Sequence, residues 1–340
     1  MSLPFAINGL GRIGRALLRI AAARPGLELV AVNDLGTAEQ LAGLIAHDSL
    51  HGPYAGEVAA AGGRLVLDGR PVAVHNEVDA ARIPWQETAP RAVVDATGRC
   101  KTRALAEQHV RAGVERVIVS ANAALDVTIC MGVNHTRYDP ARHRLLSAAS
   151  CTTNCLAPLA YLLHRELGIA RGMLNTVHSY NNDQRLLDYP HPDPRRARAA
   201  ALNMIPTTTS AVAALGRVLP ELADRLAGFA IRVPTPNVSL VDFVVTLERP
   251  ATAAAVNELF RTAAAGEMAG LLAVEDRPLV SSDFLRHPCS AIVDTALTQE
   301  VGPDMIRVVA WYDNEWGHAS RLADLLELVA APAAATGGAR

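Results

Sequence analysis

Residues 3–34 read LPFAINGLGRIGRALLRIAAARPGLELVAVND, and this stretch decides the fold class. The apolar run 3–8 predicts a strand, and the small and aliphatic residues spaced along 12–23 predict the inner face of a helix. A second apolar run, 27–33, predicts another strand. The link 9–14 fits G-x-G-x-x-G, the loop that joins strand to helix in dinucleotide-binding folds. Together these features predict the first strand–helix–strand unit of such a fold.

The glycine motif is weak evidence by itself, because three glycines at this spacing also arise by chance. Here Gly9 follows a predicted strand, and Gly11 and Gly14 open a predicted helix. Such glycines let the backbone approach a pyrophosphate, while the helix N-terminus offers free N–H groups. Asp34, twenty residues after Gly14, would accept hydrogen bonds from the adenine ribose unless it only caps a turn. A carboxylate there repels a 2′-phosphate, so the sequence favours NAD over NADP.

Two further apolar runs, 92–96 and 116–120, continue the alternation of strands and helices, with a helical segment at 104–112 between them. Strands that alternate with helices predict a doubly wound parallel sheet of the Rossmann type. Thr97 and Ser120 stand at the carboxyl ends of two of these strands, where such sheets bind cofactors. Each is interpreted either as a cofactor contact or as an ordinary turn residue.

The pattern changes at Cys151, which divides the chain into an NAD-binding domain over 1–150 and a catalytic domain over 151–316. We expect the C-terminal helix 317–330 to return to the NAD-binding domain, followed by a flexible tail over 331–340. The long strand-like runs of the second domain predict a mixed, mainly antiparallel sheet in an α+β domain; they are 229–233, 240–247 and 305–311. A long polar segment, 179–209, is typical of a functional or interface loop.

Composition excludes several functional classes. The formal net charge of the 340 residues is -2, which argues against a protein devoted to nucleic acid or to an anionic membrane. The sequence contains no run of 18 apolar residues, so we predict no membrane span, and the N-terminus lacks the pattern of a secretory signal. Lys101 is the only lysine, so phosphate binding must depend on arginine, backbone N–H groups and hydroxyls.

The five cysteines are dispersed, and they show neither a disulfide framework nor the paired CxxC spacing of a zinc site. We therefore predict no metal and a reducing, cytoplasmic location. The segment 147–155, SAASCTTNC, places Cys151 at the start of an amphipathic helix. A helix N-terminus favours the thiolate that attacks a substrate, although a lone cysteine is more often a buried small hydrophobe. Cys155, one turn later, is interpreted as core packing.

A thiol nucleophile requires a base. His178 closes the strand-like run 173–178 and precedes the long polar loop, and strand ends present their side chains to clefts. It is the best candidate among the histidines, although an isolated histidine is more often structural or exposed. The sequence thus pairs Cys151 with His178 as nucleophile and general base.

Motifs spread over residues 5–328 resemble the glyceraldehyde-3-phosphate dehydrogenase family. They are INGLGRIGR (7–15), HDSLHG (47–52), ATG (96–98), MGVN (131–134), SCTTNCLAPL (150–159), TVHSY (176–180), RRARAAALNMIP (195–206), RVPTPNVSLVD (232–242), SSDF (281–284) and WYDNEWG (311–317). The related erythrose-4-phosphate dehydrogenases share most of them. SCTTNC in register with TVH and a dinucleotide fingerprint makes the resemblance specific.

The resemblance implies NAD-dependent, phosphorylating oxidation of glyceraldehyde 3-phosphate to 1,3-bisphosphoglycerate in glycolysis. Cys151 would attack the aldehyde, hydride would pass to the nicotinamide, and inorganic phosphate would release the thioester as an acyl phosphate. His178 would take up the proton. The alternative is another phosphosugar aldehyde, chiefly erythrose 4-phosphate, with water as the acyl acceptor. A catalytically idle relative is a third interpretation, which the retained Cys151 and His178 disfavour.

The resemblance also implies the binding residues and the partners. For the attacking phosphate they are Ser150, Thr152, Arg198, Thr209 and Ser210; for the substrate phosphate they are Asn181, Asp183 and Arg232. Without the resemblance, the two arginines would be interpreted as surface ion pairs. Cofactor positions are Gly9, Gly11, Arg12, Ile13, Gly14, Asp34, Thr97, Ser120 and Asn314, and Pro190 matches a proline that accompanies NAD preference. The family further implies a homotetramer in which the 179–209 loop lines the cofactor site across an interface.

Several positions depart from the family pattern, and all concern phosphate handling or the cofactor rim. Ser210 replaces a glycine, Ala213 a lysine, Asn181 a threonine, Asn122 a proline, His318 a tyrosine and Val78 a basic residue. The nucleophile and base are unchanged. The departures leave the exact aldehyde and the acyl acceptor as the open points of the sequence interpretation.

Overall fold

The computed structural model describes residues 2–331, which divide into two compact units. Within these residues, unit 1 comprises 2–129, 136–148 and 319–331, and unit 2 comprises 130–135 and 149–318. The tail expected at 331–340 lies, beyond Ala331, outside the described residues. No helix in the described part of the chain has the length and apolar character needed to cross a membrane.

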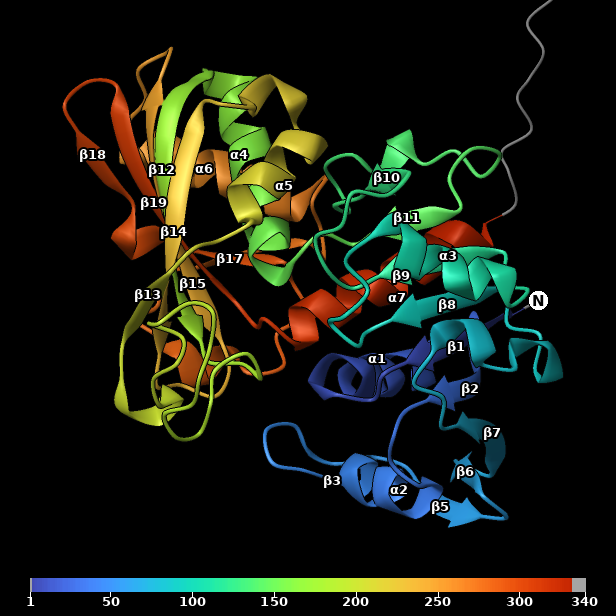
Figure 1. Ribbon diagram of the computed structural model, residues 1–340. Coiled ribbons are helices and arrows are strands. Elements are labelled where there is room, and N and C mark those ends of the chain that lie inside the picture. The colour runs from blue at the N-terminus through green and yellow to red at the C-terminus, as the bar shows by residue number, and fades with distance from the viewer. Residues whose placement is uncertain (1, 332–340) are drawn as a thin grey trace, which may run out of the picture. The chain divides into compact units, whose positions relative to one another are not determined.

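Unit 1 contains a nine-stranded sheet in the order β10-β11-β9-β8-β1-β2-β7-β6-β5 (Figure 1). Its strands are β1 (Leu3–Asn8), β2 (Leu27–Asn33), β5 (Val58–Ala61), β6 (Arg64–Leu67), β7 (Arg70–His75), β8 (Ala92–Asp95), β9 (Arg116–Val119), β10 (Val127–Thr128) and β11 (Leu145–Ser147). Pairing is parallel from β10 to β7 and antiparallel from β7 to β5. The Rossmann-like parallel sheet predicted from the sequence is confirmed.

Two of the three helices that lie wholly in unit 1 start at side chains that accept hydrogen bonds from their free N–H groups. The hydroxyl of Thr37 accepts from Gln40 N in a capping box, and the hydroxyl of Thr102 accepts from Leu105 N. Gly11 precedes the first helix in an extended conformation. These helices are α1 (Arg12–Ala22), α2 (Ala38–Ala46) and α3 (Arg103–Arg111), and a short hairpin of β3 (His47–Asp48) and β4 (Gly52–Pro53) follows α2.

Unit 2 contains an eight-stranded sheet in the order β13-β14-β12-β15-β19-β17-β16, with β18 paired to β19. Its strands are β12 (Ile169–Ser179), β13 (Ile205–Thr207), β14 (Leu226–Val233), β15 (Ser239–Leu247), β16 (Leu272–Glu275), β17 (Ala291–Asp294), β18 (Gln299–Val301) and β19 (Met305–Tyr312). Two pairs, β12 with β14 and β16 with β17, are parallel, and the others are antiparallel. The predicted mixed, mainly antiparallel sheet is confirmed.

The helices of unit 2 cover this sheet through one apolar core. They are α4 (Cys151–Leu167), α5 (Ala211–Val218) and α6 (Ala253–Ala265), and α7 (Trp316–Ala330) begins in unit 2 and continues into unit 1. Cys155 and Leu159 of α4 pack in the core with Phe243 of β15. Short 3-10 turns complete the chain: η1 (Ala80–Arg82), η2 (Trp85–Glu87), η3 (His135–Arg137), η4 (Ala200–Leu202), η5 (Pro220–Leu222), η6 (Ser281–Phe284) and η7 (Thr295–Leu297). The core fixes α4, and therefore the residue at its first position.

Candidate active site

Cys151 is the first residue of α4, as the sequence predicted. The preceding Ser150 has an extended conformation, and its hydroxyl accepts from Thr153 N at 3.2 Å. Before it, Ala149 is buried with φ 57, in the left-handed region that a residue with a Cβ seldom adopts. Backbone strain of this kind persists only where the surrounding structure enforces it, and it often marks functional sites. Here it turns the chain abruptly into the helix that carries the thiol.

His178, the second-last residue of β12, lies against this thiol. Its Nε2 is 3.4 Å from the Sγ of Cys151, and its Nδ1 is 2.7 Å from the carbonyl oxygen of Ser179. Because a carbonyl oxygen can only accept, Nδ1 must carry a proton. In the neutral ring Nε2 then holds a lone pair directed at the sulfur. This arrangement suits a general base for a thiol nucleophile.

The pKa of the Cys151 thiol differs from the expectation based on its helix position. Burial raises this pKa above its ordinary value, and the charge of Arg232 and the hydrogen bonds at the start of α4 only partly oppose the rise. A helix N-terminus favours the thiolate, but the loss of hydration on burial outweighs this effect here. Since the thiolate is not favoured by the helix alone, ionisation depends on a neighbour that accepts the proton, which gives His178 the larger role.

Arg232 supplies positive charge next to the pair. It lies beside His178 in the parallel register of β12 and β14, and its Nη1 donates to the carbonyl oxygen of Ser179 at 3.2 Å. Burial lowers the pKa of Arg232, while the nearby Cys151 opposes this shift. Its Nε is buried with no hydrogen-bond partner among the described residues. A half-buried guanidinium with an unused buried donor is suited to binding an anion.

Tyr312 contacts both the His178 ring and the start of α4. Its hydroxyl lies 2.9 Å from the hydroxyls of both Thr152 and Thr176, and its ring meets that of His178 edge-on. Burial raises the pKa of Tyr312, so the phenol stays protonated. The Thr152 hydroxyl, expected to bind phosphate, thus also bonds to Tyr312 and to the Cys151 sulfur.

The contacts of Arg196 and Arg198 differ from the sequence expectation. Arg198 pairs with Asp188, and its side chain is 60% exposed, which is the surface ion pair that the sequence had left as the alternative. Arg196, 23% exposed, instead donates to Asp183 and to the Thr207 hydroxyl. Its charge also acts on Arg232. The structure therefore brings Arg196, and not Arg198, toward the expected anion-binding residues.

The remaining expected phosphate residues form turns and a helix start. The side chain of Asn181 accepts from Asp183 N, and the hydroxyl of Thr209 accepts from Ala211 N at the beginning of α5. Ser210 precedes that helix without a side-chain capping bond. Among the family departures, Ala213 is exposed on α5 and Val78 on unit 1.

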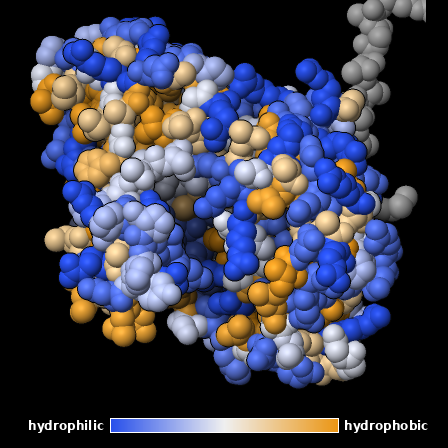
Figure 2. Space-filling model, in the orientation of Figure 1, coloured by the Kyte–Doolittle hydropathy of each residue, from blue (hydrophilic) through white to orange (hydrophobic). Residues whose placement is uncertain are grey.

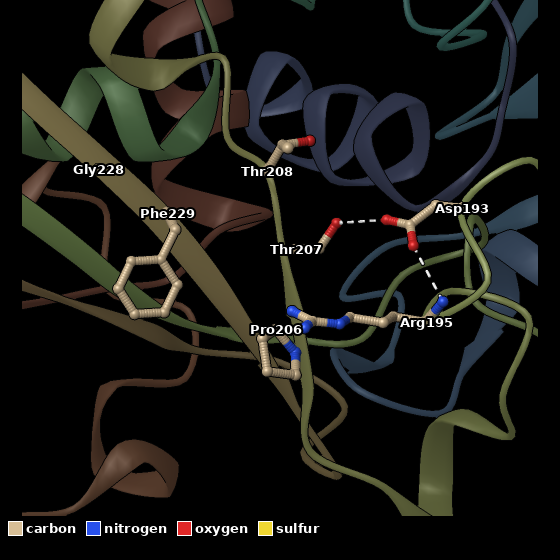
Figure 3. Close-up of a pocket in the computed structure, with 7 residues that line it drawn as sticks. All are labelled: Asp193, Arg195, Pro206, Thr207, Thr208, Gly228 and Phe229. Atoms are coloured by element: carbon tan, nitrogen blue, oxygen red, sulfur yellow. Dashed lines mark hydrogen bonds between the residues drawn. The ribbon is translucent and has the colours of Figure 1, made fainter.

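A pocket lies beside the edge strand β13. Figure 3 shows its lining, in which Asp193 accepts from the Thr207 hydroxyl and from the backbone N–H of Arg195. The full lining is Asp193, Arg195, Pro206, Thr207, Thr208, Gly228 and Phe229. Neither Cys151 nor His178 borders it, so this pocket is separate from the thiol.

Asn314 has a defined amide orientation. Its Oδ1 accepts from the hydroxyls of Ser179 and Ser239, both at 2.9 Å. With the oxygen engaged twice, the amide nitrogen can present its N–H groups to a ligand acceptor. Ser239 follows Val238, a buried β-branched residue held at φ 65. The strained backbone fixes the hydroxyl that orients Asn314.

The glycine loop of unit 1 has the shape that a dinucleotide requires. Gly9 has φ +96, and a Cβ there would meet the backbone nitrogen of Thr97 at 3.0 Å. A Cβ on Gly14 would lie 2.0 Å from the carbonyl oxygen of Gly9. Asp34 accepts from the backbone N–H groups of Leu10 and Gly36 through separate oxygens. Tight glycines, a helix N-terminus and a fixed acid fit the pyrophosphate and ribose of NAD.

The other expected cofactor residues lie at the same edge of this sheet or on α1. Thr97 follows β8, and its hydroxyl donates to Asp95 at 2.7 Å. Ser120 follows β9, and its backbone N–H donates to the Asp95 carbonyl oxygen. Arg12 and Ile13 form the first turn of α1. No cluster of metal-binding side chains occurs among residues 2–331.

Sequence reasoning missed several residues that the structure places in these sites. The chain repeats arginine three times over 195–198, and no local signal indicates which one turns inward. Tyr312 and Ser239 lie within the quoted motifs WYDNEWG and RVPTPNVSLVD, but no local signal indicates their contacts in the site. Asp95 and His109, which bond to each other in unit 1, gave no signal at all.

Comparison with known proteins matches both parts of the chain to one family. Residues 3–103 match the family model of the glyceraldehyde 3-phosphate dehydrogenase NAD binding domain, and residues 150–314 match the model of its C-terminal domain. A glyceraldehyde-3-phosphate dehydrogenase of Geobacillus stearothermophilus is 49% identical over 331 residues, 97% of this chain and 99% of the relative. Glyceraldehyde-3-phosphate dehydrogenase 1 of Bacillus subtilis (strain 168) is 48% identical over the same shares. Glyceraldehyde-3-phosphate dehydrogenase 2 of Streptomyces arenae is 47% identical, also over 97% and 99%.

Proposed function

The chain belongs to the glyceraldehyde-3-phosphate dehydrogenase family and is an NAD-dependent dehydrogenase of that type, and from this premise we propose a thioester mechanism on Cys151. The substrate would be glyceraldehyde 3-phosphate and the acyl acceptor inorganic phosphate, giving 1,3-bisphosphoglycerate. The observation that carries the proposal is the 3.4 Å approach of His178 Nε2 to the Cys151 sulfur, with Nδ1 held by a carbonyl oxygen.

The first step forms the bond between Cys151 Sγ and the aldehyde carbon. His178 Nε2 takes the thiol proton as the sulfur attacks, because its lone pair faces the sulfur. The backbone N–H of Cys151 at the start of α4 can stabilise the oxygen that gains charge. NAD, when bound, supplies the hydride acceptor that converts the adduct to a thioester. His178 first returns its proton to the charged oxygen, which gives the hydroxyl of the adduct, and it takes that proton up again when hydride leaves the carbon.

The second half of the reaction releases the acyl group. Phosphate attacks the thioester carbon, the carbon–sulfur bond breaks, and Cys151 leaves as a thiolate. We assign the attacking phosphate to Ser150, Thr152, Thr209 and Ser210, with Arg196 in the role expected of Arg198. The substrate phosphate is assigned to Arg232 and Asn181, with Asp183 holding Arg196 through its 2.8 Å bond. Arginine forks bind phosphate bidentately, and this chain has almost no lysine to do so.

The second candidate is oxidation of erythrose 4-phosphate with water as acceptor. It rests on Ser210 and Ala213, which alter the start of α5 where the attacking phosphate is assigned. Initial rates on both aldehydes, with and without phosphate and with NAD and NADP, separate the two. We expect NADH formation on glyceraldehyde 3-phosphate to require phosphate, or arsenate as a substitute. A rate on that aldehyde independent of phosphate would exclude the first candidate.

We assign NAD to the loop Gly9–Gly14, Asp34 and Thr97 of unit 1, with Arg12, Ile13 and Ser120 nearby; Asn314 of unit 2 is added as a cofactor position on the family resemblance alone. Asp34 favours NAD because its carboxylate would face the 2′-phosphate of NADP. Asp34→Ala should weaken NAD binding and narrow the difference between NAD and NADP. An unchanged preference would remove Asp34 from the cofactor site.

We also propose that the enzyme is a cytoplasmic homotetramer, the number four coming from the family resemblance. Support for self-association comes from the exposed hydrophobic residues of the segment before β13: Leu186, Leu187, Tyr189, Leu202 and Met204. Figure 2 shows hydrophobic surface at the lower left, where this segment lies in Figure 1. The five free cysteines fit a reducing compartment. Analytical ultracentrifugation should give four times the chain mass of 36.0 kDa, and a monomer would refute the assembly.

A further inference from the structure

Unit 1 contains a buried chain of hydrogen-bonded side chains that the proposed reaction does not use. Trp85 Nε1 donates to His109 Nδ1 at 3.1 Å, and His109 Nε2 lies 3.2 Å from Asp95 Oδ2. Asn8 Nδ2 donates to the same carboxylate oxygen at 2.8 Å, and Asn33 Nδ2 donates to Asn8 Oδ1 at 2.8 Å. All five side chains are buried.

The proton positions in this chain are forced from its two ends. An indole nitrogen can only donate, so Nδ1 of His109 must hold a lone pair. The ring is therefore neutral, and Nε2 carries the proton that it donates to Asp95. At the other end, Asn33 Oδ1 accepts from the backbone N–H of Glu77, which leaves its amide nitrogen to donate to Asn8. Asn33 Nδ2 also donates to the Glu77 carbonyl oxygen at 2.9 Å, so the donors that converge on Asp95 from the two sides are His109 Nε2 and Asn8 Nδ2.

Asp95 consequently collects four hydrogen bonds. Oδ2 accepts from His109 and Asn8, and Oδ1 accepts from the backbone N–H and hydroxyl of Thr97 at 3.1 and 2.7 Å. An unpaired buried carboxylate is strongly unfavourable, whereas one that accepts several N–H and O–H bonds remains ionised. An uncharged amide in the same place could not accept all four.

The residues that Asp95 joins stand at three neighbouring strand ends. Asn8 ends β1 and leads into the glycine loop, Asn33 ends β2 and precedes Asp34, and Asp95 ends β8 and precedes Thr97. In the sheet these strands lie in the order β8-β1-β2. These are the strand ends that carry the cofactor residues assigned above.

The loops that follow these strand ends leave little free space between them. A Cβ on Gly9 would come within 3.1 Å of the Ala96 carbonyl carbon and the Thr97 Cα, so the loops after β1 and β8 are in close contact. The Gly9 backbone N–H also donates to the Asn33 carbonyl oxygen at 2.8 Å. A shift of any one strand end would therefore displace the glycine loop.

We propose that Asp95 is a positioning residue for the dinucleotide: with His109 and Trp85 behind it, it holds the ends of β1, β2 and β8 at the spacing that NAD binding requires. This inference rests on the proposed cofactor site. It assigns Asp95 no contact with substrate or cofactor. His109 acts only as a fixed neutral donor, and Trp85 selects its tautomer.

The decisive variant is Asp95→Asn in the full-length enzyme, measured by titration with NAD. The amide directs N–H groups at donors, so a folded variant should bind NAD at least about tenfold more weakly, the effect of leaving a buried donor unsatisfied. With NAD saturating, kcat and the KM for the aldehyde should stay within about threefold, because the thiol and its base lie in unit 2.

A matched control is Asp126→Asn. Asp126 also belongs to unit 1 and accepts from Arg103 and from the backbone N–H groups of Arg144 and Leu145. Asp126 accepts from the backbone of Leu145, the first residue of β11. It therefore acts at the amino ends of the parallel strands, whereas Asp95 lies at their carboxyl ends. This variant should lose stability without weakening NAD binding. An equal loss of NAD affinity in both variants would mean general loosening of unit 1 and would overturn the proposal.

His109 offers a second, milder test should Asp95→Asn fail to fold. His109→Leu removes the donor and should weaken NAD binding, whereas His109→Gln keeps an N–H donor and should restore affinity to within about threefold of the wild type. Equal affinities of the two variants would overturn the proposal. Asp34→Ala tests the cofactor site itself: if it weakens NAD binding and Asp95→Asn does not, the positioning role alone fails. If Asp34→Ala has no effect, the assigned site fails.

Discussion

Two buried histidines, one in each unit, perform opposite tasks because of the partner on Nδ1. In unit 2 the Nδ1 of His178 donates to the Ser179 carbonyl oxygen, which leaves Nε2 to accept a proton from Cys151. In unit 1 the Nδ1 of His109 accepts from Trp85, which makes Nε2 a donor to Asp95. One ring is arranged as a base and the other as a fixed donor.

The difference shows that a histidine beside an ionisable group is not by that fact catalytic. His109 is bonded at both nitrogens to buried residues, and its Nε2 proton stays in the hydrogen bond to Asp95, a carboxylate whose pKa lies below its ordinary value. His178 faces a thiol whose pKa is raised by burial, so a proton can pass between them. The chemistry is set by the group behind the ring as much as by the group in front of it.

The largest expected effect comes from replacing the base. His178→Asn keeps a donor near the Ser179 carbonyl oxygen but removes the lone pair that faces Cys151. We expect kcat to fall by about 10²- to 10⁴-fold, the usual contribution of a general base. The matching change, His109→Gln, should leave kcat at saturating NAD within about threefold. Steady-state assays that found equal losses in kcat would abolish the distinction between the two histidines.

Thiol labelling tests the coupling between Cys151 and its base. Since burial raises the pKa of Cys151, deprotonation near neutral pH must depend on His178. Iodoacetamide should label Cys151 ahead of the other four cysteines, and His178→Asn should slow that labelling by about tenfold or more. Cys155→Ala serves as control, because Cys155 is buried in the core and its thiol pKa is well above the ordinary value. Equal labelling of all five cysteines would argue against a catalytic Cys151.

The pH dependence of the free energy of unfolding tests Asp95, the hydrogen-bond partner of His109 in unit 1. Burial by itself would raise the pKa of Asp95, but hydrogen bonds from His109 and Thr97 lower it below its ordinary value of 3.8. A depressed carboxyl pKa stabilises the fold above 3.8, and the contribution is lost as pH falls below that value. Denaturant melts should show a stability difference between wild type and Asp95→Asn that is largest above pH 4 and shrinks below it. If the stability difference between wild type and Asp95→Asn grew on acidification, the pKa of Asp95 could not be lowered in the folded protein.

The smallest effect concerns the amide that two serines orient in unit 2. Ser239→Ala removes one of the two donors to Asn314 Oδ1 and should raise the KM for NAD by about two- to tenfold, the value of one hydrogen bond. Thr246→Ser, on the same strand β15 but at its far end, is the control. A change in the aldehyde KM with no change in the NAD KM would point to a different role for Asn314.

Much of the fold could be predicted because its signals are local. The bounds of β1 and β2 coincide with the apolar runs, and α4 begins at Cys151 where the small polar residues end. The antiparallel extension β5–β7 was not predicted, although Gly62 and Gly63, both at positive φ, form a two-residue hairpin link of a recognised type.

The site was predictable only in part, for a physical reason. Residue types and strand ends indicated the nucleophile and the base, but burial, which decides the pKa of Cys151, is a tertiary property. The choice of Arg196 over Arg198 depends on which side chain reaches Asp183 across the loop. The tautomer of His109 depends on Trp85 and Asp95, which lie outside its own helix. The tautomer of His178 depends on the backbone geometry that brings its Nδ1 to the Ser179 carbonyl oxygen. No local sequence pattern contains either feature.

Neutron diffraction from crystals of the enzyme exchanged into D₂O tests the central comparison most directly, because it locates the deuterium on each imidazole. We expect deuterium on Nδ1 of His178, facing the Ser179 carbonyl oxygen, and on Nε2 of His109 with a bare Nδ1 facing Trp85. A bare Nδ1 on His178, or deuterium on Nδ1 of His109, would contradict the assignment of one histidine as base and the other as fixed donor.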